Sequence, residues 1–385
     1  MSVTAAAGFR AAGVAAGIKA SGALDLALVV NDGPASAAAG VFTRNQVKAA
    51  PVLWSAQVLT GKRLRAVVLN SGGANACTGP GGFQDTHATA ERVATLLDCG
   101  AAEVAVCSTG LIGERLPLEA LLAGVDRAGA DLAATPEAGL AAATAVLTTD
   151  TVPKQAAVSG GGWAVGGFAK GVGMIAPSLA TMLSVLTTDA AVDGSTLDTV
   201  LRSAAAATFE RLDIDGSCST NDTVLLLASG ASGVTPDRAA FADAVVQVCH
   251  TLVKALQADA EGVTKEITIT VHGARGDADA LDAARAIARD SLVKTALFGS
   301  DPNWGRIAAA VGASPATVRS GILDISINGV LLCQGGAVAM DRTKADLSGR
   351  EITVEIDLHL GSGRATVLTT DLSHGYVDEN SAYSS

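Results

Sequence analysis

Short apolar runs separated by glycine-rich or polar turns are the dominant pattern along this chain. Runs of roughly four to eight apolar residues between turn signals are typical of buried strands. They predict strands at 26–30, 37–43, 64–69, 103–107, 184–188 and 223–228. A pair at 154–158 and 163–169, joined by Ser159–Gly162, reads as a hairpin, and later strands are predicted at 266–271, 322–327, 329–332, 352–358 and 363–369.

Apolar residues with helical spacing fall between many of these strands. They predict helices at 85–98, 118–128, 138–147, 195–212, 236–259 and 281–289. Strands and helices are mixed without strict alternation, so the pattern favours an α+β arrangement over a doubly wound parallel sheet. At 385 residues the chain is too long for one ordinary core, and we expect two domains or one large layered body.

Composition narrows the range of functions. Hydrophobic residues make up 49% of the chain and aromatic residues only 3%, so the core is built mainly from Ala, Val and Leu. The formal net charge is −11, which argues against nucleic-acid binding, because that requires clustered Lys and Arg. Net charge does not bear on a small-molecule site, where one local cation can dominate.

Cysteine and histidine usage gives no sign of a metal site. The six cysteines form no C-x-x-C pair and there are five histidines, so we predict buried free thiols in a reducing compartment and no bound metal. The N-terminus has no signal-peptide pattern, and no apolar run is judged long enough to span a bilayer. These features predict a soluble cytoplasmic protein that contacts no membrane.

The segment KGVGMIAPSLATMLSVLTTD, residues 170–189, carries the most specific chemistry. Lys170 and glycines precede an apolar run that reaches Ala180-Thr181 and then a predicted strand. If the Ala180–Thr181 bond were cut, Thr181 would carry a free amine beside its hydroxyl, and such a Thr can act as nucleophile with its amine as base. From this segment alone, a plain buried strand residue is the alternative for Thr181.

A second segment suits acyl transfer. Ser108-Thr109-Gly110 follows a predicted strand and precedes Pro117, where a helix is expected to open. The tetrahedral oxyanion of acyl transfer is commonly stabilised by a backbone N–H and a side-chain hydroxyl. Thr109 and Gly110 offer both, although a helix-capping loop explains the same residues.

These segments resemble the ornithine acetyltransferase family, also called bifunctional glutamate N-acetyltransferase. KGVGMIAPSLATML is similar to the family's cleavage-site segment, and the likeness continues through T-D-T-x-P-K, E-G-x-T-K, G-x-D-P-N-W-G-R and the C-terminal tail. It departs at Ser217-Cys218, where members often have Asp-Thr. The resemblance implies a precursor that cuts itself before Thr181, giving chains 1–180 and 181–385.

The resemblance also implies a reaction and a site. Thr181 would carry acetyl from N-acetylornithine to glutamate in the cyclic pathway of arginine biosynthesis, with Thr109 and Gly110 as the oxyanion hole. The residues implied to bind substrate, taken position by position, are Thr151, Lys170, Thr181, Glu261, Asn380 and Ser385. By charge, Lys170 suits a substrate carboxylate and Glu261 the ornithine side chain. No cofactor is implied, with acetyl-CoA as a conceivable second acetyl donor.

For the fold, the family implies an α-β-β-α layered body similar to N-terminal-nucleophile hydrolases but differently connected, with a second, smaller α/β part. It further implies a heterotetramer of two chains of each kind, and a C-terminal tail, 373–385, that docks at the site. Two other readings remain at this point: a self-processing aminopeptidase or amidohydrolase of related fold, and an intact, non-catalytic amino-acid-binding protein.

Overall fold

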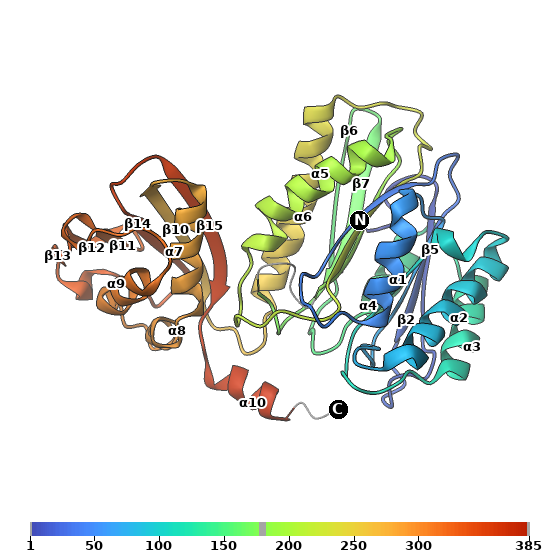
Figure 1. The fold of residues 1–385 in the computed structure, drawn as a ribbon, viewed down its shortest axis with the longest axis horizontal. Helices are drawn as coiled ribbons and strands as arrows, with labels where there is room; N and C mark the ends of the chain where they lie inside the picture. The colour runs from blue at the N-terminus through green and yellow to red at the C-terminus, as the bar shows by residue number, and fades with distance from the viewer. Residues whose placement is uncertain (1, 177–181, 383–385) are drawn as a thin grey trace. The chain divides into compact units, whose positions relative to one another are not determined.

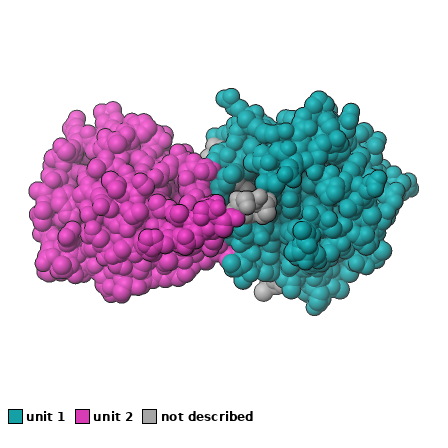
Figure 2. Space-filling view, turned by 90° about the horizontal axis from the view of Figure 1, so that it is seen from below, with its two compact units in different colours: residues 1–210, 218–256 teal, residues 211–217, 257–385 magenta. Residues whose placement is uncertain are grey.

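The computed structural model describes residues 2–176 and 182–382. The chain divides into two compact units, shown in different colours in Figure 2. Unit 1 comprises residues 1–210 and 218–256, and unit 2 comprises residues 211–217 and 257–385. The expected second, smaller part is therefore present as unit 2, whereas the division into chains 1–180 and 181–385 by a cut stays a prediction.

The first sheet of unit 1 has the strand order β1-β2-β4-β5. Its strands are β1 (Phe9–Val14), β2 (Leu26–Asn31), β4 (Ala66–Asn70) and β5 (Val104–Ser108). The last three are buried along their whole length, as expected for apolar runs without alternation. Helices α2 (Gly79–Leu97) and α3 (Leu118–Ala130) pack against this sheet.

The second sheet of unit 1 has the order β3-β9-β8-β7-β6. Its strands are β3 (Ala37–Phe42), β6 (Lys154–Gly160), β7 (Trp163–Lys170), β8 (Leu183–Thr188) and β9 (Thr223–Ala228). Helices α5 (Gly194–Ala207) and α6 (Arg238–Ala258) cover it (Figure 1), and the Phe241 ring of α6 meets Trp163 of β7 edge to face, with 5.7 Å between ring centroids.

One hydrophobic core joins the two sheets. Leu28 and Val67 of the first sheet belong to the same buried cluster as Phe168, Val185 and Leu225 of the second. Two helices complete the unit: α1 (Ala50–Val58), beside β5, and α4 (Pro136–Ala145), beside β1. Unit 1 thus has a layer of helices, two facing sheets and a second layer of helices. This is the α-β-β-α layering expected for the larger part.

In the second sheet, the two strands that follow the predicted cut lie between strands that precede it. β3, β7 and β6 precede residue 180, whereas β8 and β9 follow it. β8 pairs antiparallel with β7, with Lys170 opposite Leu183, and parallel with β9, with Leu183 opposite Thr223. The backbone ladder of this sheet therefore crosses between the two predicted chains.

Unit 2 is built on a mixed six-stranded sheet in the order β13-β12-β11-β14-β10-β15. The strands are β10 (Glu266–Ala274), β11 (Asp324–Ile327), β12 (Val330–Gln334), β13 (Ala337–Val338), β14 (Glu351–Asp357) and β15 (Gly363–Thr370). Its helices are α7 (Asp277–Arg289), α8 (Ser291–Phe298), α9 (Trp304–Ala313) and the C-terminal α10 (His374–Ala382). Helix α7 packs on β10 and β15, and α9 packs on α7, around a core separate from that of unit 1.

Three expectations need correction. Cys107, Cys249 and Cys333 are buried thiols, but Cys77 is exposed and Cys99 and Cys218 are half-buried. The helix predicted at 195–212 ends at Ala207, and the segment after it continues as a short 3-10 turn. The helix predicted at 138–147 begins and ends two residues earlier, as α4 (Pro136–Ala145).

Helix α6 qualifies the expectation about membrane spans. It has 21 residues, and an 18-residue window with a mean hydropathy of 1.3 passes a test of length and composition for crossing a bilayer. The core-facing residues Phe241, Val245, Val248 and Leu252 are fully buried inside the protein, and they account for much of that hydropathy. A core helix of this kind passes the same test, so the segment is weak evidence for a membrane.

Candidate active site

Lys170 is the centre of a buried polar cluster in unit 1. It ends β7, and its side chain is 2% exposed. Its ammonium donates to Thr148 Oγ1 at 2.8 Å and to Thr109 Oγ1 at 3.2 Å, and it lies 3.8 Å from Asp150 Oδ2. A buried cation surrounded by two hydroxyls and a carboxylate is a costly arrangement that needs compensation, so it marks a candidate site.

Thr109 is held by the loop that follows β5. Its N–H donates to the carbonyl of Asn70 at 3.0 Å, and the Asn70 side chain accepts from the Ser108 hydroxyl at 2.6 Å. Gly110 has a φ of +127°. A Cβ on Gly110 would lie 2.6 Å from backbone atoms of Gly72 and Gly73, so only glycine fits there.

Asp150 is the anion of the cluster. Its side chain is 0% exposed, and Oδ1 accepts from Lys154 Nζ and from the Gly171 N–H, each at 2.7 Å. Burial by itself would raise the pKa of this carboxyl, but Lys170, Lys154 and the Gly171 amide outweigh burial and lower the pKa to about 2. Asp150 is therefore ionised at neutral pH and balances the lysine charges.

The start of β8 is anchored by Asp222. Met182, the first described residue after the predicted nucleophile, donates its N–H to Asp222 Oδ1 at 3.2 Å. Within the described residues, the buried Asp222 Oδ2 has no hydrogen-bond partner. Burial, and next the nearby Cys218, raise the pKa of this carboxyl well above its usual range. The adjacent Asn221 amide donates to the carbonyls of Ala74 and Ser108, at 2.6 and 2.8 Å.

A second polar cluster lies in unit 2 around Glu261. The C-terminal helix α10 starts against the loop that carries this residue, and the Ser373 hydroxyl donates to Gly262 O at 2.5 Å. A Cβ on Gly262 would lie 2.1 Å from Tyr376 N, so the contact requires glycine, which also adopts φ +60°. At the far end of α10, Asn380 Nδ2 donates to Glu261 Oε2 at 2.9 Å.

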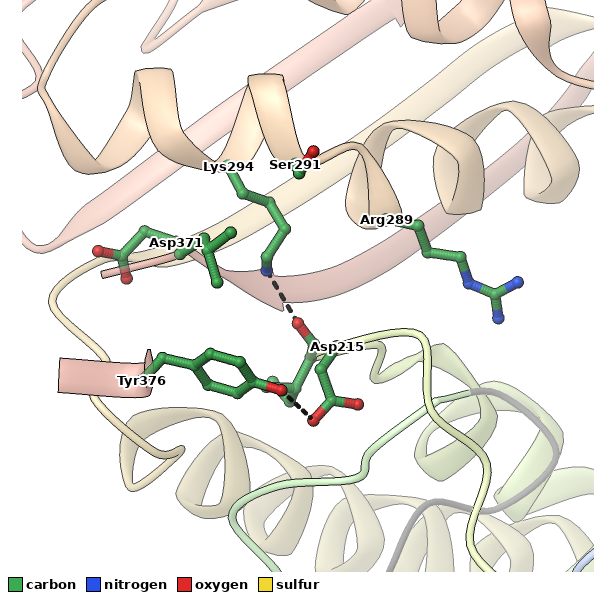
Figure 3. Close-up of a pocket in the computed structure, with 8 residues that line it drawn as sticks. Asp215, Arg289, Ser291, Lys294, Asp371 and Tyr376 are labelled. Carbon is green, nitrogen blue, oxygen red and sulfur yellow. Dashed lines mark hydrogen bonds between the residues drawn. The ribbon is translucent and has the colours of Figure 1, made fainter. Parts of the chain in front are cut away.

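Unit 2 also has a pocket of about 140 Å³ beside α8 and α10. Figure 3 shows Lys294 extending toward the segment that carries Asp215, with Tyr376 opposite it. Lys294 donates to Ile214 O at 2.9 Å, to Thr369 Oγ1 at 3.1 Å and to Thr370 O, and Tyr376 Oη donates to Asp215 Oδ2 at 3.3 Å. Because its three protons are directed at protein acceptors, Lys294 has none left for a ligand.

In the described part of the chain, no group of three or more His, Cys, Asp or Glu side chains is arranged to hold a metal ion. The clusters above are suited to proton transfer and to stabilising an anion. A buried hydroxyl held by a cation, beside a glycine amide, is the donor set that acyl transfer requires.

Comparison with known proteins decides the family. The profile of the ArgJ family matches residues 10–385. This chain belongs to the ArgJ family. It is 67% identical to the arginine biosynthesis bifunctional protein ArgJ of Mycolicibacterium paratuberculosis and 64% identical to that of Mycobacterium tuberculosis H37Rv; each alignment covers 100% of this chain and 96% of the relative.

A solved structure, described as ornithine acetyltransferase from Mycobacterium tuberculosis complexed with ornithine, is 68% identical. Its match covers 46% of this chain and 95% of that chain, with a TM-score of 0.46. The family profile and the two ArgJ relatives confirm the family expected from the sequence resemblance.

The structure brings some of the predicted residues together. Lys170 and Thr109, 61 positions apart in the sequence, are in direct contact, and Gly110 follows in the same loop. Asn380 and Glu261 are also in contact. Thr151 is exposed, and it is Thr148 of the same loop whose hydroxyl binds Lys170. Ala180, Thr181 and Ser385 lie outside the described residues.

Sequence reasoning missed Thr148, Asp150 and the anchoring role of Asp222. The sequence did contain a signal. Thr148 and Asp150 lie in the polar segment before Pro153, in which only Thr151 was identified from the sequence. Among the described residues, Ser373, His374 and Asp378 are not arranged as a catalytic triad. The His374 ring packs edge to face on Phe298 at 5.4 Å, and the Ser373 hydroxyl is committed to Gly262.

Proposed function

We propose that this ArgJ-family chain is a self-cleaving acetyltransferase that moves acetyl from N-acetylornithine to glutamate through an acetyl-Thr181 intermediate. The observation that carries the proposal is the contact of Lys170 with Thr109. Through this contact, a buried hydroxyl and the loop with Gly110 lie beside Lys170, at the end of β7. Lys170 pairs with Leu183 of β8, and Leu183 is two positions after Thr181 in the sequence.

The first step is self-cleavage. The Thr181 hydroxyl attacks the carbonyl carbon of Ala180, the C–N bond between the two residues breaks, and an ester forms on the Thr181 oxygen as its amine takes up a proton. Water then hydrolyses the ester, leaving a carboxylate on Ala180 and a free α-amine on Thr181. An intact chain has no such amine, because there the Thr181 nitrogen is an amide.

The second step is acetyl transfer. The α-amine, whose unperturbed pKa is about 7.7–8.0, takes the hydroxyl proton while the oxygen attacks the acetyl carbonyl of N-acetylornithine. Thr109 O–H and Gly110 N–H stabilise the resulting oxyanion. The C–N bond of the substrate breaks and ornithine leaves with the proton on its amine. The amine of glutamate then attacks acetyl-Thr181 and regenerates the hydroxyl.

Further parts of the proposal rest on the family resemblance. They are substrate contacts by Thr151, Lys170, Glu261, Asn380 and Ser385, a heterotetramer of two chains 1–180 and two chains 181–385, a cytoplasmic location, and acetyl-CoA as a second donor. The pairing of β8 with β7 and of β9 with β3 supports joint retention of the two chains after the cut, since separating the chains would break these two backbone ladders.

Intact-mass measurement with N-terminal sequencing tests the proposal. We expect the purified wild type to contain two chains, the second beginning at Thr181. Thr181→Ala is expected to give one uncut chain without transferase activity, whereas Thr181→Ser keeps the hydroxyl and still cuts. A wild-type enzyme that is active and wholly uncut would refute the proposal, and acetate release at an equal rate without glutamate would indicate a hydrolase.

A further inference from the structure

The Thr109 hydroxyl has a proton that no described residue accepts. Thr109 is 2% exposed, and its Oγ1 accepts from Lys170 Nζ at 3.2 Å. A hydroxyl has one proton and two lone pairs, whereas an ammonium only donates, so Lys170 occupies a lone pair and leaves the proton for another acceptor. Buried polar groups are nearly always satisfied, so a buried hydroxyl in this state points to an acceptor supplied by a ligand.

Lys170 also changes the strength of that hydroxyl as a donor. Hydrogen bonds that involve an ion are stronger than neutral ones, and neighbouring hydrogen bonds in a buried chain polarise one another. A cation that donates to Oγ1 draws electron density away from the O–H bond. The hydroxyl becomes a better donor to a developing negative charge, which is what an oxyanion hole requires.

The position of Lys170 is itself fixed from two sides. Its ammonium donates to Thr148 Oγ1 at 2.8 Å and lies 3.8 Å from Asp150, which in turn accepts from Lys154 Nζ at 2.7 Å. Two of the three Lys170 protons are therefore directed at threonine hydroxyls of the protein. This arrangement suits a group that orients its neighbours.

We propose that Lys170 is a positioning residue for the oxyanion hole: it holds Thr109 Oγ1 so that the hydroxyl proton is directed at the oxyanion, and Asp150 with Lys154 holds Lys170. The inference rests on the proposed acyl transfer and assigns Lys170 a role through Thr109. It adds a role through Thr109 to the substrate contact proposed for Lys170 above. The same device serves self-cleavage, whose intermediate carries the same kind of oxyanion.

A double-mutant cycle of Lys170→Met and Thr109→Ala tests this coupling. The precursor's self-cleavage rate is followed on denaturing gels, and kcat and KM for N-acetylornithine and glutamate are measured on the cleaved fraction after long incubation. Each single change is expected to slow both reactions by about 10²–10³, the range for one lost oxyanion donor. In the Thr109→Ala background, Lys170→Met is expected to cost little more.

Two further variants guard against a folding defect. Asp150→Asn keeps the side-chain shape and removes the negative charge that faces Lys170. It is expected to lower kcat with little change in KM. As for Lys170→Met, this loss is expected only when Thr109 is present. Lys265→Met is the matched control in unit 2, because Lys265 is a buried lysine whose ammonium donates to the carbonyls of Leu347, Ser348 and Gly349. It is expected to lower the unfolding temperature and leave kcat unchanged.

The outcomes separate the two proposals. If the rate losses of Lys170→Met and Thr109→Ala multiply in the double variant, the positioning role is overturned. A large rise in KM with unchanged kcat for Lys170→Met would also overturn it and would make Lys170 a substrate ligand only. In both cases the wild type remains cleaved and active. A wild type that neither cuts nor transfers acetyl would instead refute the proposed function.

Discussion

Two of the buried lysines, Lys170 in unit 1 and Lys294 in unit 2, differ in most of their partners. Lys170 in unit 1 donates to the hydroxyls of Thr148 and Thr109 and faces Asp150. Lys294 in unit 2 donates to the carbonyls of Ile214 and Thr370 and to the hydroxyl of Thr369. Both are close to fully buried, at 1% and 5% exposure.

The difference lies in whether the oxygen that accepts from the lysine carries a proton of its own to donate. A carbonyl oxygen accepts and has no proton, so a hydrogen-bond chain that reaches it ends there. A hydroxyl that accepts from a lysine still has a proton to donate. The Thr369 hydroxyl directs its proton at Ala288 O, at 3.4 Å, whereas the Thr109 proton has no acceptor among the described residues. Lys294 therefore ties the segment before Ser217 to the end of β15, whereas Lys170 acts on a group that can still bind a ligand. Burial, which is the largest influence, lowers the pKa of Lys294 to about 8.

The largest effect that would test this comparison is expected at Thr109. Thr109→Ala removes the hydroxyl that accepts the hydrogen bond from Lys170. It is expected to slow acetyl transfer and self-cleavage by about 10²–10³. The rates are measured as above. Thr109→Ser keeps the hydroxyl and serves as the control, with at most a small loss. Normal self-cleavage and turnover by Thr109→Ala would show that Thr109 is a loop residue without a role in catalysis.

Lys294→Met is expected to reduce stability and leave the chemistry unchanged. The substitution leaves buried oxygens without a donor, at about 1–3 kcal/mol for each one that stays unsatisfied. Chemical denaturation monitored by circular dichroism measures the loss, and kcat of the folded fraction is expected to match the wild type. A fall in kcat at unchanged stability would remove the distinction between the two lysines.

The C-terminal helix gives a smaller effect. Deleting Asn380–Ser385 removes the Asn380 bond to Glu261 and is expected to raise KM about tenfold or more, which corresponds to ~1.4 kcal/mol of binding. Ser381→Ala is a suitable control, because the Ser381 hydroxyl donates to Asp378 O within α10. Unchanged kinetics after the deletion would show that the tail has no part in binding.

Tyr376→Phe is expected to have the smallest effect. It removes the hydroxyl that donates to Asp215 Oδ2 at 3.3 Å but keeps the ring, at a cost of about 0.5–1.5 kcal/mol to the docking of α10. Limited proteolysis of α10 measures the docking, with faster cleavage expected in the variant. Equal rates would mean that the Gly262 and Ser373 contacts hold α10 by themselves.

The sequence by itself determined most elements and the chemistry of two segments. Apolar runs located β2, β4, β5, β8 and β9 because these strands are buried on both faces. The pattern did not identify β1, where half of the residues are Ala or Gly, or α1, whose apolar residues surround the helix without a distinct face. Elements of that kind are defined by packing rather than by periodicity.

Only the tertiary structure decided which polar residues act together. Thr109 and Lys170 are 61 positions apart, and no spacing rule in the sequence links them. Lys170 and Lys294 both stand in apolar surroundings along the chain, and their different roles arise from the oxygens that the fold places around each ammonium. Sequence periodicity records which face of an element is buried, whereas hydrogen bonds between distant segments depend on how the sheets and loops are assembled.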